Sequence, residues 1–218
     1  MFTAIIPIKK SLNEQLEIID YQGNTLLDNK IKILKNIDAI TEIIIASDSQ
    51  EIERYTKKNG VTFFLRETSP INEDSFSSLV QDVVTTAKNS KIIWSFATTP
   101  FIDEKVLSKA VEDYTNLNFE IYDSLITCSE LKRFILDENG PLNFRTGSRH
   151  QSSQSLSSLY LLINGYFIMS KELNLKYSYP WGKVPSKQLI DNYIGFEIKD
   201  KKDFEIFTNV YLPNEEKL

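Results

Sequence analysis

Apolar and polar residues follow two alternating patterns through the first half of the chain. Short apolar runs of the kind found in strands buried on both faces cover residues 2–8, 43–46, 61–65 and 92–96. Apolar residues at intervals of three and four predict helices over residues 26–37, 51–58, 76–88 and 104–117. Strand and helix therefore alternate regularly.

This alternation, with short connections, predicts right-handed crossovers between parallel strands. We expect an α/β fold of three layers, in which a doubly wound, mostly parallel sheet is covered by helices on both faces. Ligands of such folds gather at the carboxyl ends of the strands. No internal repeat and no linker rich in proline or glycine divides the chain, so we expect residues 1–218 to form one domain.

The second half begins with strands that have no helices between them. Residues 124–128 and 134–136 read as strands, and Asp-Glu-Asn-Gly at 137–140 is typical of a tight reversal, which predicts a small β excursion. Residues 146–158 are dominated by Ser and Gln. They predict either an irregular segment that faces a ligand or partner, or a plain surface loop.

The chain then returns to apolar patterning. Residues 159–168 predict a strand that is interrupted at Asn164-Gly165, and a last strand is expected at 196–198. A helix over residues 201–211 is expected to close the fold.

Composition and charge narrow the classes of function. Of the 218 residues, 41% are apolar and 25% are charged, as in an ordinary globular protein, and no apolar run is long enough to span a membrane. The formal net charge of -5 disfavours nonspecific binding to nucleic acid or to an anionic membrane. One cysteine, Cys128, permits no intrachain disulfide and favours a reducing compartment, so we expect a cytoplasmic protein.

Polar residues follow several of the expected strands. Lys9, Lys10 and Ser11 come directly after the first strand, where two cations and a hydroxyl suit a polyphosphate, although solvated lysines are the commoner reason for such a pair. Asp48 follows the second strand, as do many carboxylates that bind metal or ribose. With Glu51 it also forms a helix-capping pair, and we favour that interpretation.

Later strands offer hydroxyl and carboxylate groups. Thr98 and Thr99 follow the fourth strand, where they either face a ligand or form the turn before an Asp103 cap. Near the last helix, Glu197 and Asp200 offer oxygen ligands to a hard divalent cation. Asp200, like Asp203, is more simply a helix cap. The lone histidine, His150, is expected first to be an exposed loop residue, and a substrate contact is the second interpretation.

Several short segments carry motifs in a common order. They are Ala-Ile-Ile-Pro at 4–7, Gly-Asn-Thr-Leu-Leu at 23–27, Ile-Ala-Ser-Asp at 45–48, Leu-Arg at 65–66, Glu-Asp-Ser-Phe-Ser-Ser at 73–78, Ala-Thr-Thr-Pro at 97–100, Gln-Ser-Leu-Ser at 154–157, Asn-Gly-Tyr-Phe-Ile at 164–168 and Phe-Glu-Ile-Lys at 196–199. Together they resemble the acylneuraminate cytidylyltransferase family, which includes CMP-sialic acid synthetases, over residues 4–210. This chain looks like a divergent member.

The resemblance implies a nucleotide-diphospho-sugar transferase-like fold and an Mg²⁺-dependent transfer of CMP from CTP to an acidic keto-sugar destined for a surface glycan. It implies a homodimer, with residues 132–160 as a dimerisation and sugar-site excursion. The implied nucleotide-binding residues are Lys9, Lys10, Ser11, Arg66, Asp74 and Ser75. The implied sugar-binding residues are Thr98, Thr99, Gln154, Tyr160, Asn164 and Gly165. Lys9 and Glu197 are the implied catalytic residues, and Glu197 and Asp200 the implied metal ligands.

The chain departs from the family pattern at several places, among them a shorter first loop in which Leu12-Asn13 replaces a Ser-Lys pair. Lys9 stands where the family has an arginine, Phe96 where it has a glutamine, and Lys199 where it has the second aspartate of a metal-binding pair. Two alternatives therefore stay open. One is a homologue without turnover that acts as a nucleotide-binding or partner subunit, and the other is a transferase for a different nucleotide.

Overall fold

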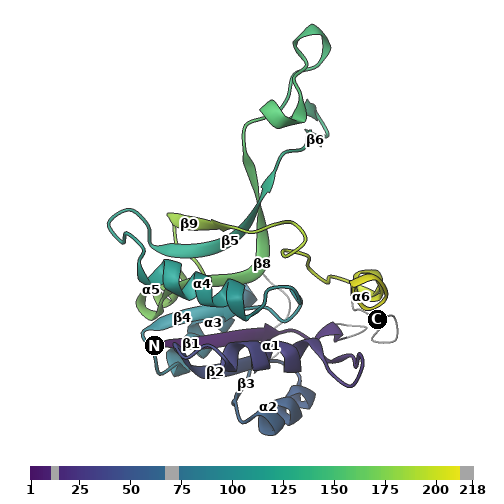
Figure 1. Cartoon of the computed structure of the whole chain (residues 1–218). Helices are drawn as coiled ribbons and strands as arrows, with labels where there is room; N and C mark the ends of the chain where they lie inside the picture. The colour runs from purple at the N-terminus through teal and green to yellow at the C-terminus, as the bar shows by residue number, and fades with distance from the viewer. Residues whose placement is uncertain (11–14, 67–73, 212–218) are drawn as a thin grey trace.

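A computed structural model of the chain describes residues 1–10, 15–66 and 74–211 (Figure 1). These residues form a seven-stranded sheet in the order β3-β2-β1-β4-β8-β5-β9. The strands are β1 (Phe2–Ile8), β2 (Ile40–Ser47), β3 (Thr62–Leu65), β4 (Lys91–Ser95), β5 (Ser124–Leu131), β8 (Leu159–Ser170) and β9 (Pro185–Leu189). All run parallel except β8, which is antiparallel to β4 and β5.

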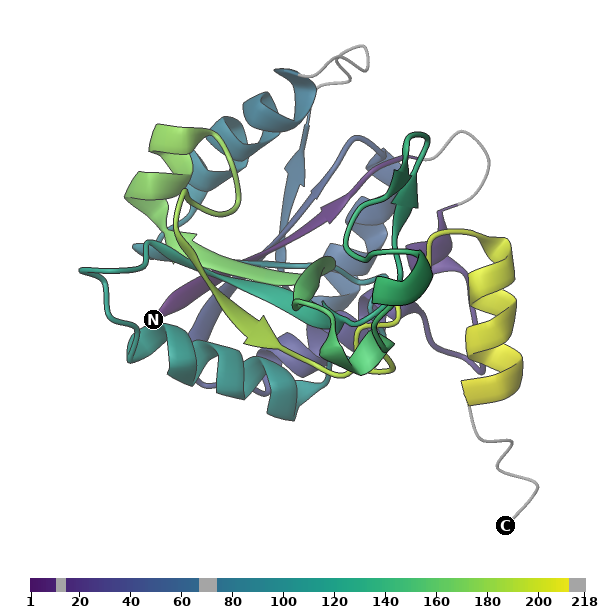
Figure 2. The ribbon, with the colours of Figure 1, turned by 90° about the horizontal axis from the view of Figure 1, so that it is seen from above.

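Helices cover both faces of this sheet, as Figure 2 shows from above. The helices are α1 (Leu26–Lys35), α2 (Glu53–Asn59), α3 (Asp74–Thr86), α4 (Glu104–Thr115), α5 (Lys171–Tyr177) and α6 (Lys201–Ile206), which continues into a π-helical segment, η5 (Phe207–Tyr211). Side chains of α1, α4 and α6 share one core, and those of α3 and α5 share the other. Successive residues of β4 divide between them, since Ile93 enters the first core while Ile92 and Trp94 enter the second. The expected three-layer α/β fold is confirmed.

Local signals in the sequence account for where several helices begin and end. The Thr25 side chain accepts from the amide of Asp28 at 3.0 Å and caps α1, and Asp103 caps α4 by accepting from Val106 at 2.9 Å. Such caps are each worth about 1 kcal/mol. At the other end of α2, Gly60 takes a left-handed conformation with φ of 62°, which glycine adopts without steric cost. The predicted Asp103 cap is thus confirmed.

Most predicted elements of the first half are present, and β1 has the predicted bounds. The second half differs more. The expected strand at 196–198 is wrong: Ile198 donates one backbone hydrogen bond to the carbonyl of Thr98 at 2.8 Å and joins no ladder. Strand β9 and helix α5 were not predicted, because Pro185–Leu189 is mostly polar and α5 is only seven residues long.

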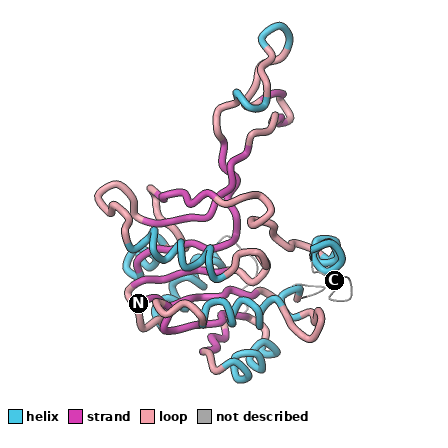
Figure 3. The backbone as a smooth tube through the Cα atoms, in the orientation of Figure 1, coloured by secondary structure: helices cyan, strands magenta, loops and turns pink. Residues whose placement is uncertain are grey.

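Strands β5 and β8 continue past the sheet as a two-stranded ribbon, in which residues 128–131 pair with 159–162. Beyond it, residues 132–158 project from the body, at the top of Figures 1 and 3. This arm contains β6 (Leu136–Asp137), β7 (Gly140–Pro141) and two 3-10 turns, η3 (Gly147–Arg149) and η4 (Ser153–Ser155). The predicted reversal at 137–140 and the predicted irregular segment at 146–158 are confirmed.

An aromatic cluster gives the arm its internal packing. The rings of Phe134 and Phe144 lie 4.8 Å apart, and the His150 ring lies 5.0 Å from Phe134. His150 is exposed, as expected. In the part of the chain that is described, no helix has the length and apolar character needed to cross a bilayer.

Candidate active site

The order of the strands reverses between β1 and β4. The chain moves outward from β1 to β2 and β3, then crosses back to place β4 on the other side of β1. In doubly wound sheets, ligands bind in the crevice outside the carboxyl ends of the strands at such a switch point. Two segments lie at this switch point: Lys9 and Lys10 after β1, and residues 96–102 after β4.

Lys9 and Lys10 are exposed at the end of β1. The backbone amide of Lys10 donates to Asp48 Oδ1 at 2.6 Å, so the carboxylate after β2 holds the start of the loop after β1. The expected capping role of Asp48 is wrong, because Ser49 precedes the 3-10 turn η2 (Gln50–Ile52) and no side chain caps it. Ser11 lies outside the described residues.

The loop after β4 is held from within. The hydroxyl of Thr99 is buried and donates to the carbonyl of Phe96 at 3.0 Å, which is the turn role that the sequence also allowed. Thr98 accepts the amide of Ile198 through its carbonyl. The amide of Phe96 donates to the carbonyl of Gly165 at 3.2 Å. This loop therefore joins β8 on one side and the segment before α6 on the other.

A bulge in β8 brings Asn164 and Gly165 to this loop. Ile126 of β5 pairs with Phe167 and Cys128 pairs with Leu162, so residues 163–166 stand opposite Thr127 alone. The predicted interruption of the strand is therefore confirmed as a break in the ladder. A Cβ atom on Gly165 would lie 2.3 Å from Ile102 Cδ1. A larger residue at position 165 would therefore force the Ile102 side chain to move.

Beside the bulge, Asn164 is linked to two charged residues. The Asn164 side-chain amide donates to Glu197 Oε1 at 2.9 Å. Lys199 Nζ lies 3.6 Å from Glu197 Oε2. The Glu197 side chain is 17% exposed, whereas that of Lys199 is 71% exposed. The carboxylate is thus largely enclosed and the ammonium faces outward.

The carboxylates that were predicted to bind magnesium have protein partners in this structure. Both oxygens of Glu197 already have partners, and Asp200 Oδ1 accepts from the amides of Lys202 and Asp203 as the cap of α6. Mg²⁺ requires near-octahedral oxygen ligands. Among residues 1–10, 15–66 and 74–211, no three His, Cys, Asp or Glu side chains gather to hold a metal. The roles of Glu197 and Asp200 as metal ligands stay predictions.

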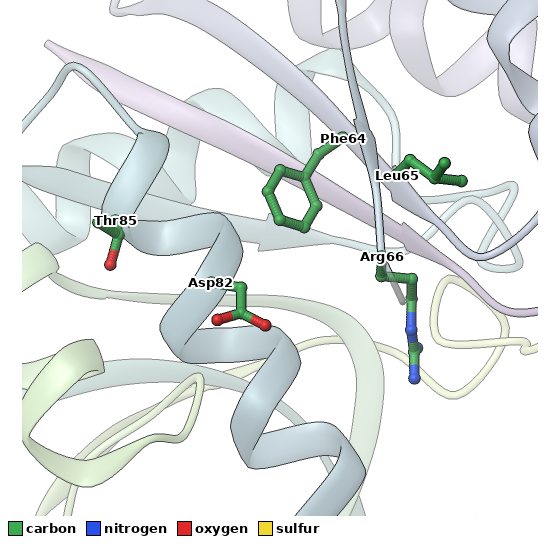
Figure 4. Close-up of a pocket in the computed structure, with 5 residues that line it drawn as sticks. All are labelled: Phe64, Leu65, Arg66, Asp82 and Thr85. Atoms are coloured by element: carbon green, nitrogen blue, oxygen red, sulfur yellow. The ribbon is translucent and has the colours of Figure 1, made fainter. Parts of the chain in front are cut away.

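Arg66 lies elsewhere, at the end of the edge strand β3, where its amide donates to the carbonyl of Ser47 at 3.0 Å. It lines an open pocket of about 500 Å³ together with Phe64, Leu65, Asp82 and Thr85. Figure 4 shows the Arg66 side chain directly after β3 and the Asp82 side chain on α3. Asp74 and Ser75 are the first residues of α3, and the structure describes their backbone but not their side chains.

The remaining predicted sugar contacts, Gln154 and Tyr160, belong to the arm and the ribbon below it. Gln154 is exposed in η4, and Tyr160 is 45% exposed with Lys187 Nζ 5.3 Å from its ring centroid. The structure brings Thr98, Thr99, Asn164, Gly165 and Glu197 together. It carries Gln154 outward on the projecting arm (Figure 1).

One residue at this site was missed from the sequence. Lys30 of α1 is buried, and its Nζ donates to the carbonyls of Thr99 at 3.1 Å and Ile102 at 3.0 Å. Burial lowers its pKa to about 7, with a smaller opposing effect of the Asp103 carboxylate. The available signal was a lysine on the apolar stripe of α1, next to Ile31 and four residues after Leu26.

The profile of the cytidylyltransferase family matches residues 17–160. The chain belongs to the cytidylyltransferase family. No curated protein sequence matches this cytidylyltransferase. The family resemblance seen in the sequence is thus confirmed at the level of cytidylyltransferases, whose general activity is CTP-dependent nucleotidyl transfer.

Solved structures share the fold of this cytidylyltransferase. The 4-diphosphocytidyl-2C-methyl-D-erythritol synthase of Anaerococcus prevotii is similar with a TM-score of 0.67 and 16% identity, over 96% of this chain and 95% of that one. A CMP:2-keto-3-deoxy-manno-octonic acid synthetase complexed with CTP is similar with a TM-score of 0.63 and 10% identity, over 87% of this chain and 90% of that one. HddC of Yersinia pseudotuberculosis is similar with a TM-score of 0.58 and 15% identity, over 97% of this chain and 100% of that one. These likenesses establish a nucleotide-diphospho-sugar transferase-like fold.

Proposed function

We propose that this cytidylyltransferase transfers CMP from CTP to a hydroxyl of an acidic keto-sugar of the nonulosonic class and releases pyrophosphate. One observation carries the proposal. Lys9 and Lys10 follow β1 and the Asn164–Glu197 pair lies beside the loop after β4, at the two strands that flank the switch point. A triphosphate and a polyhydroxylated acceptor would meet there. A relative of the same fold, the CMP:2-keto-3-deoxy-manno-octonic acid synthetase, is described with CTP bound.

In the proposed reaction, the acceptor hydroxyl oxygen bonds to the α-phosphorus of CTP. The bond between that phosphorus and the pyrophosphate oxygen breaks, and the hydroxyl proton passes to solvent. Such transfers depend mostly on positioning and on neutralisation of charge. Lys9 and Lys10 would neutralise the phosphates, and Mg²⁺ would enter as part of the MgCTP substrate. Arg66, with Asp74, Ser75 and Ser11, would contact the nucleotide.

On the acceptor side, the Asn164–Glu197 pair is the proposed sugar contact. The Asn164 amide nitrogen is used by Glu197, which leaves its carbonyl oxygen to accept from a sugar hydroxyl. Lys199, largely exposed beside this pair, offers a cation to the sugar carboxylate. Thr98, Thr99 and Gly165 would shape the same surface. We place the reaction in the cytoplasm, as the single cysteine favours.

We further propose that the protein works as a homodimer, with the arm and ribbon as its interface. Four successive ribbon residues, Leu159 to Leu162, are 38% to 48% exposed, although neighbouring strand residues point to opposite faces. Leu136 and Leu142 of the arm are at least 60% exposed. Apolar surface on both faces of a projecting ribbon favours a protein partner. The partner's arm and ribbon would then supply Gln154 and Tyr160 respectively.

The charge pair between Lys199 and Glu197 favours one alternative, a homologue that binds nucleotide without turnover, since a salt bridge occupies the carboxylate. Pyrophosphate release from CTP and Mg²⁺ with a panel of nonulosonic acids separates the two. UTP, GTP and ATP in place of CTP test the nucleotide. We expect release with CTP and at least one acid, at ordinary enzyme rates. Silence across the panel, together with no rise in melting temperature on adding CTP, would reject the proposal.

A further inference from the structure

A charged residue occupies a position on α1 that packing alone would give to an apolar one. Lys30 is 1% exposed and lies on the buried stripe of the helix with Leu27, Ile31 and Leu34. Lysine is almost never fully buried unless its ammonium group is paired, because the charge loses its hydration. A methionine would fill similar space without that cost. The ammonium group therefore has a use that side-chain volume does not explain.

The partners of Lys30 identify that use. Its Nζ donates to the carbonyls of Thr99 and Ile102, 69 and 72 residues further along the chain. These two carbonyls bracket the turn that joins β4 to α4, immediately before the Asp103 cap. At longer range, the Asp103 carboxylate also acts on the Lys30 ammonium group. One side chain thus holds both ends of a short turn against α1.

This turn is in direct contact with the candidate acceptor site. The side chain of Ile102 packs against Gly165, whose carbonyl accepts from Phe96. The Thr99 hydroxyl also lies 3.5 Å from the carbonyl of Asn164. Thr98 receives the amide of Ile198, the residue after Glu197. Displacement of the turn would therefore move both members of the Asn164–Glu197 pair.

We propose that Lys30 is a positioning residue, which fixes the turn at residues 99–102 and through it sets the geometry of the acceptor site at Asn164 and Glu197. Lys30 touches neither substrate nor the reacting atoms. The kinetic consequence of this inference rests on the proposed function. The claim that Lys30 holds the turn does not. A misplacement of about 1 Å at a reacting pair costs on the order of a hundredfold in rate. A small shift of this turn is therefore enough to matter.

The test compares the full-length Lys30→Met variant with Lys32→Met. Lys32 is exposed on the same helix, so its variant controls for the loss of a lysine from α1. Hydrogen–deuterium exchange is measured by mass spectrometry on peptides that cover residues 96–103, 163–166 and 196–199. We expect about tenfold faster exchange in these three segments of Lys30→Met, and unchanged exchange in the strands β1 and β2. Lys32→Met should match the wild type throughout.

A second experiment measures turnover of the acidic sugar and binding of CTP separately. For Lys30→Met we expect kcat/KM for the acidic sugar to fall about tenfold or more, while the Kd for CTP changes by less than about threefold. Unchanged exchange and unchanged kcat/KM in folded Lys30→Met would overturn the proposal. So would faster exchange spread evenly through both cores, because that outcome describes a residue needed only for folding.

The two proposals fail in different ways. If the wild type releases no pyrophosphate, the proposed function fails, and the exchange measurement still decides whether Lys30 holds the turn to Asn164 and Glu197. If Lys30→Met does not fold, Lys30→Gln takes its place in both measurements. Glutamine keeps two N–H donors on a shorter side chain, so it should give a smaller change in the same direction. A Lys30→Gln variant identical to the wild type would also overturn the proposal.

Discussion

The side-chain amide of Asn164 donates a 2.9 Å hydrogen bond to Glu197 Oε1, across 33 residues of sequence. It joins the bulge of β8 to the segment before α6. It thus holds in place the carboxylate of Glu197, which lies outside the strands. Lys199 occupies the other oxygen of Glu197. The candidate acceptor site of this cytidylyltransferase is therefore an amide, a carboxylate and an ammonium group in series.

This arrangement predicts an unusual response to the substitution Lys199→Asp. A carboxylate in place of the ammonium group would free Glu197 Oε2 and give the site two adjacent oxygen donors, so half-maximal turnover should require less free Mg²⁺ than in the wild type. Lys199→Ala removes the cation without adding a donor and serves as the control. Turnover is measured against Mg²⁺ at saturating CTP. Identical Mg²⁺ curves for Lys199→Asp and Lys199→Ala would contradict the prediction.

The contact between Asp48 and the amide of Lys10 predicts a role in nucleotide binding. Asp48→Ala removes the acceptor that holds the start of the loop after β1. We expect the Kd for CTP to rise about tenfold or more, because one charge-assisted hydrogen bond is worth about 1.5–3 kcal/mol. Binding is measured by calorimetry. The exposed Asp137 of the arm provides a control, as Asp137→Ala, which should bind CTP like the wild type.

Gly165→Ala should destabilise the fold, because its Cβ would lie 2.3 Å from Ile102 Cδ1. Overpacking of this kind costs about 1–3 kcal/mol. The double variant Gly165→Ala/Ile102→Val lacks the Cδ1 atom and should recover part of the loss. Urea unfolding of the wild type, both single variants and the double variant completes the cycle. Strictly additive effects would show that the two residues do not collide.

Stability should depend on pH through Lys30. Its pKa is about 7 in the folded protein, because burial outweighs the opposing Asp103 carboxylate, and about 10.4 in an unfolded chain. Between these pH values the unfolded state holds a proton that the folded state has lost. This group therefore increases the free energy of unfolding as pH rises. The difference between wild type and Lys30→Met should shift by up to about 4 kcal/mol in favour of the wild type from pH 7 to pH 10. A difference that stays flat over this range would refute the assignment.

The arm predicts an oligomeric state that surface charge can disrupt. Leu161 is 48% exposed on the ribbon, and Leu161→Glu would place a charge in the proposed dimer interface. We expect the wild type to sediment as a dimer and Leu161→Glu as a monomer with an unchanged far-ultraviolet circular dichroism spectrum. Ile206→Glu, which alters an exposed apolar residue of α6 outside the arm, should remain dimeric. A wild type that sediments as a monomer would reject the interface.

The sequence was sufficient for the layered fold and for several local features. Continuous apolar runs mark strands such as β4 that are buried on both faces, and period-3.6 patterns mark the apolar stripe of helices such as α1, so strand and helix types were read correctly through residue 117. Turn and capping chemistry is also local. The Asp-Glu-Asn-Gly reversal at 137–140, the Asp103 cap and the interruption at Asn164-Gly165 were therefore predicted from a few neighbouring residues.

Tertiary structure alone decided which side chains meet. Asp48 reads locally as a cap, yet it binds the amide of Lys10 in the loop after another strand. Lys30 reads as an irregularity on an apolar stripe until the turn at 99–102 is packed against α1. Strand β9 and the pair of Asn164 with Glu197 likewise depend on partners more than 30 residues away. Short-range patterns record which face of an element is buried, whereas partners distant in sequence are chosen only when the sheet assembles.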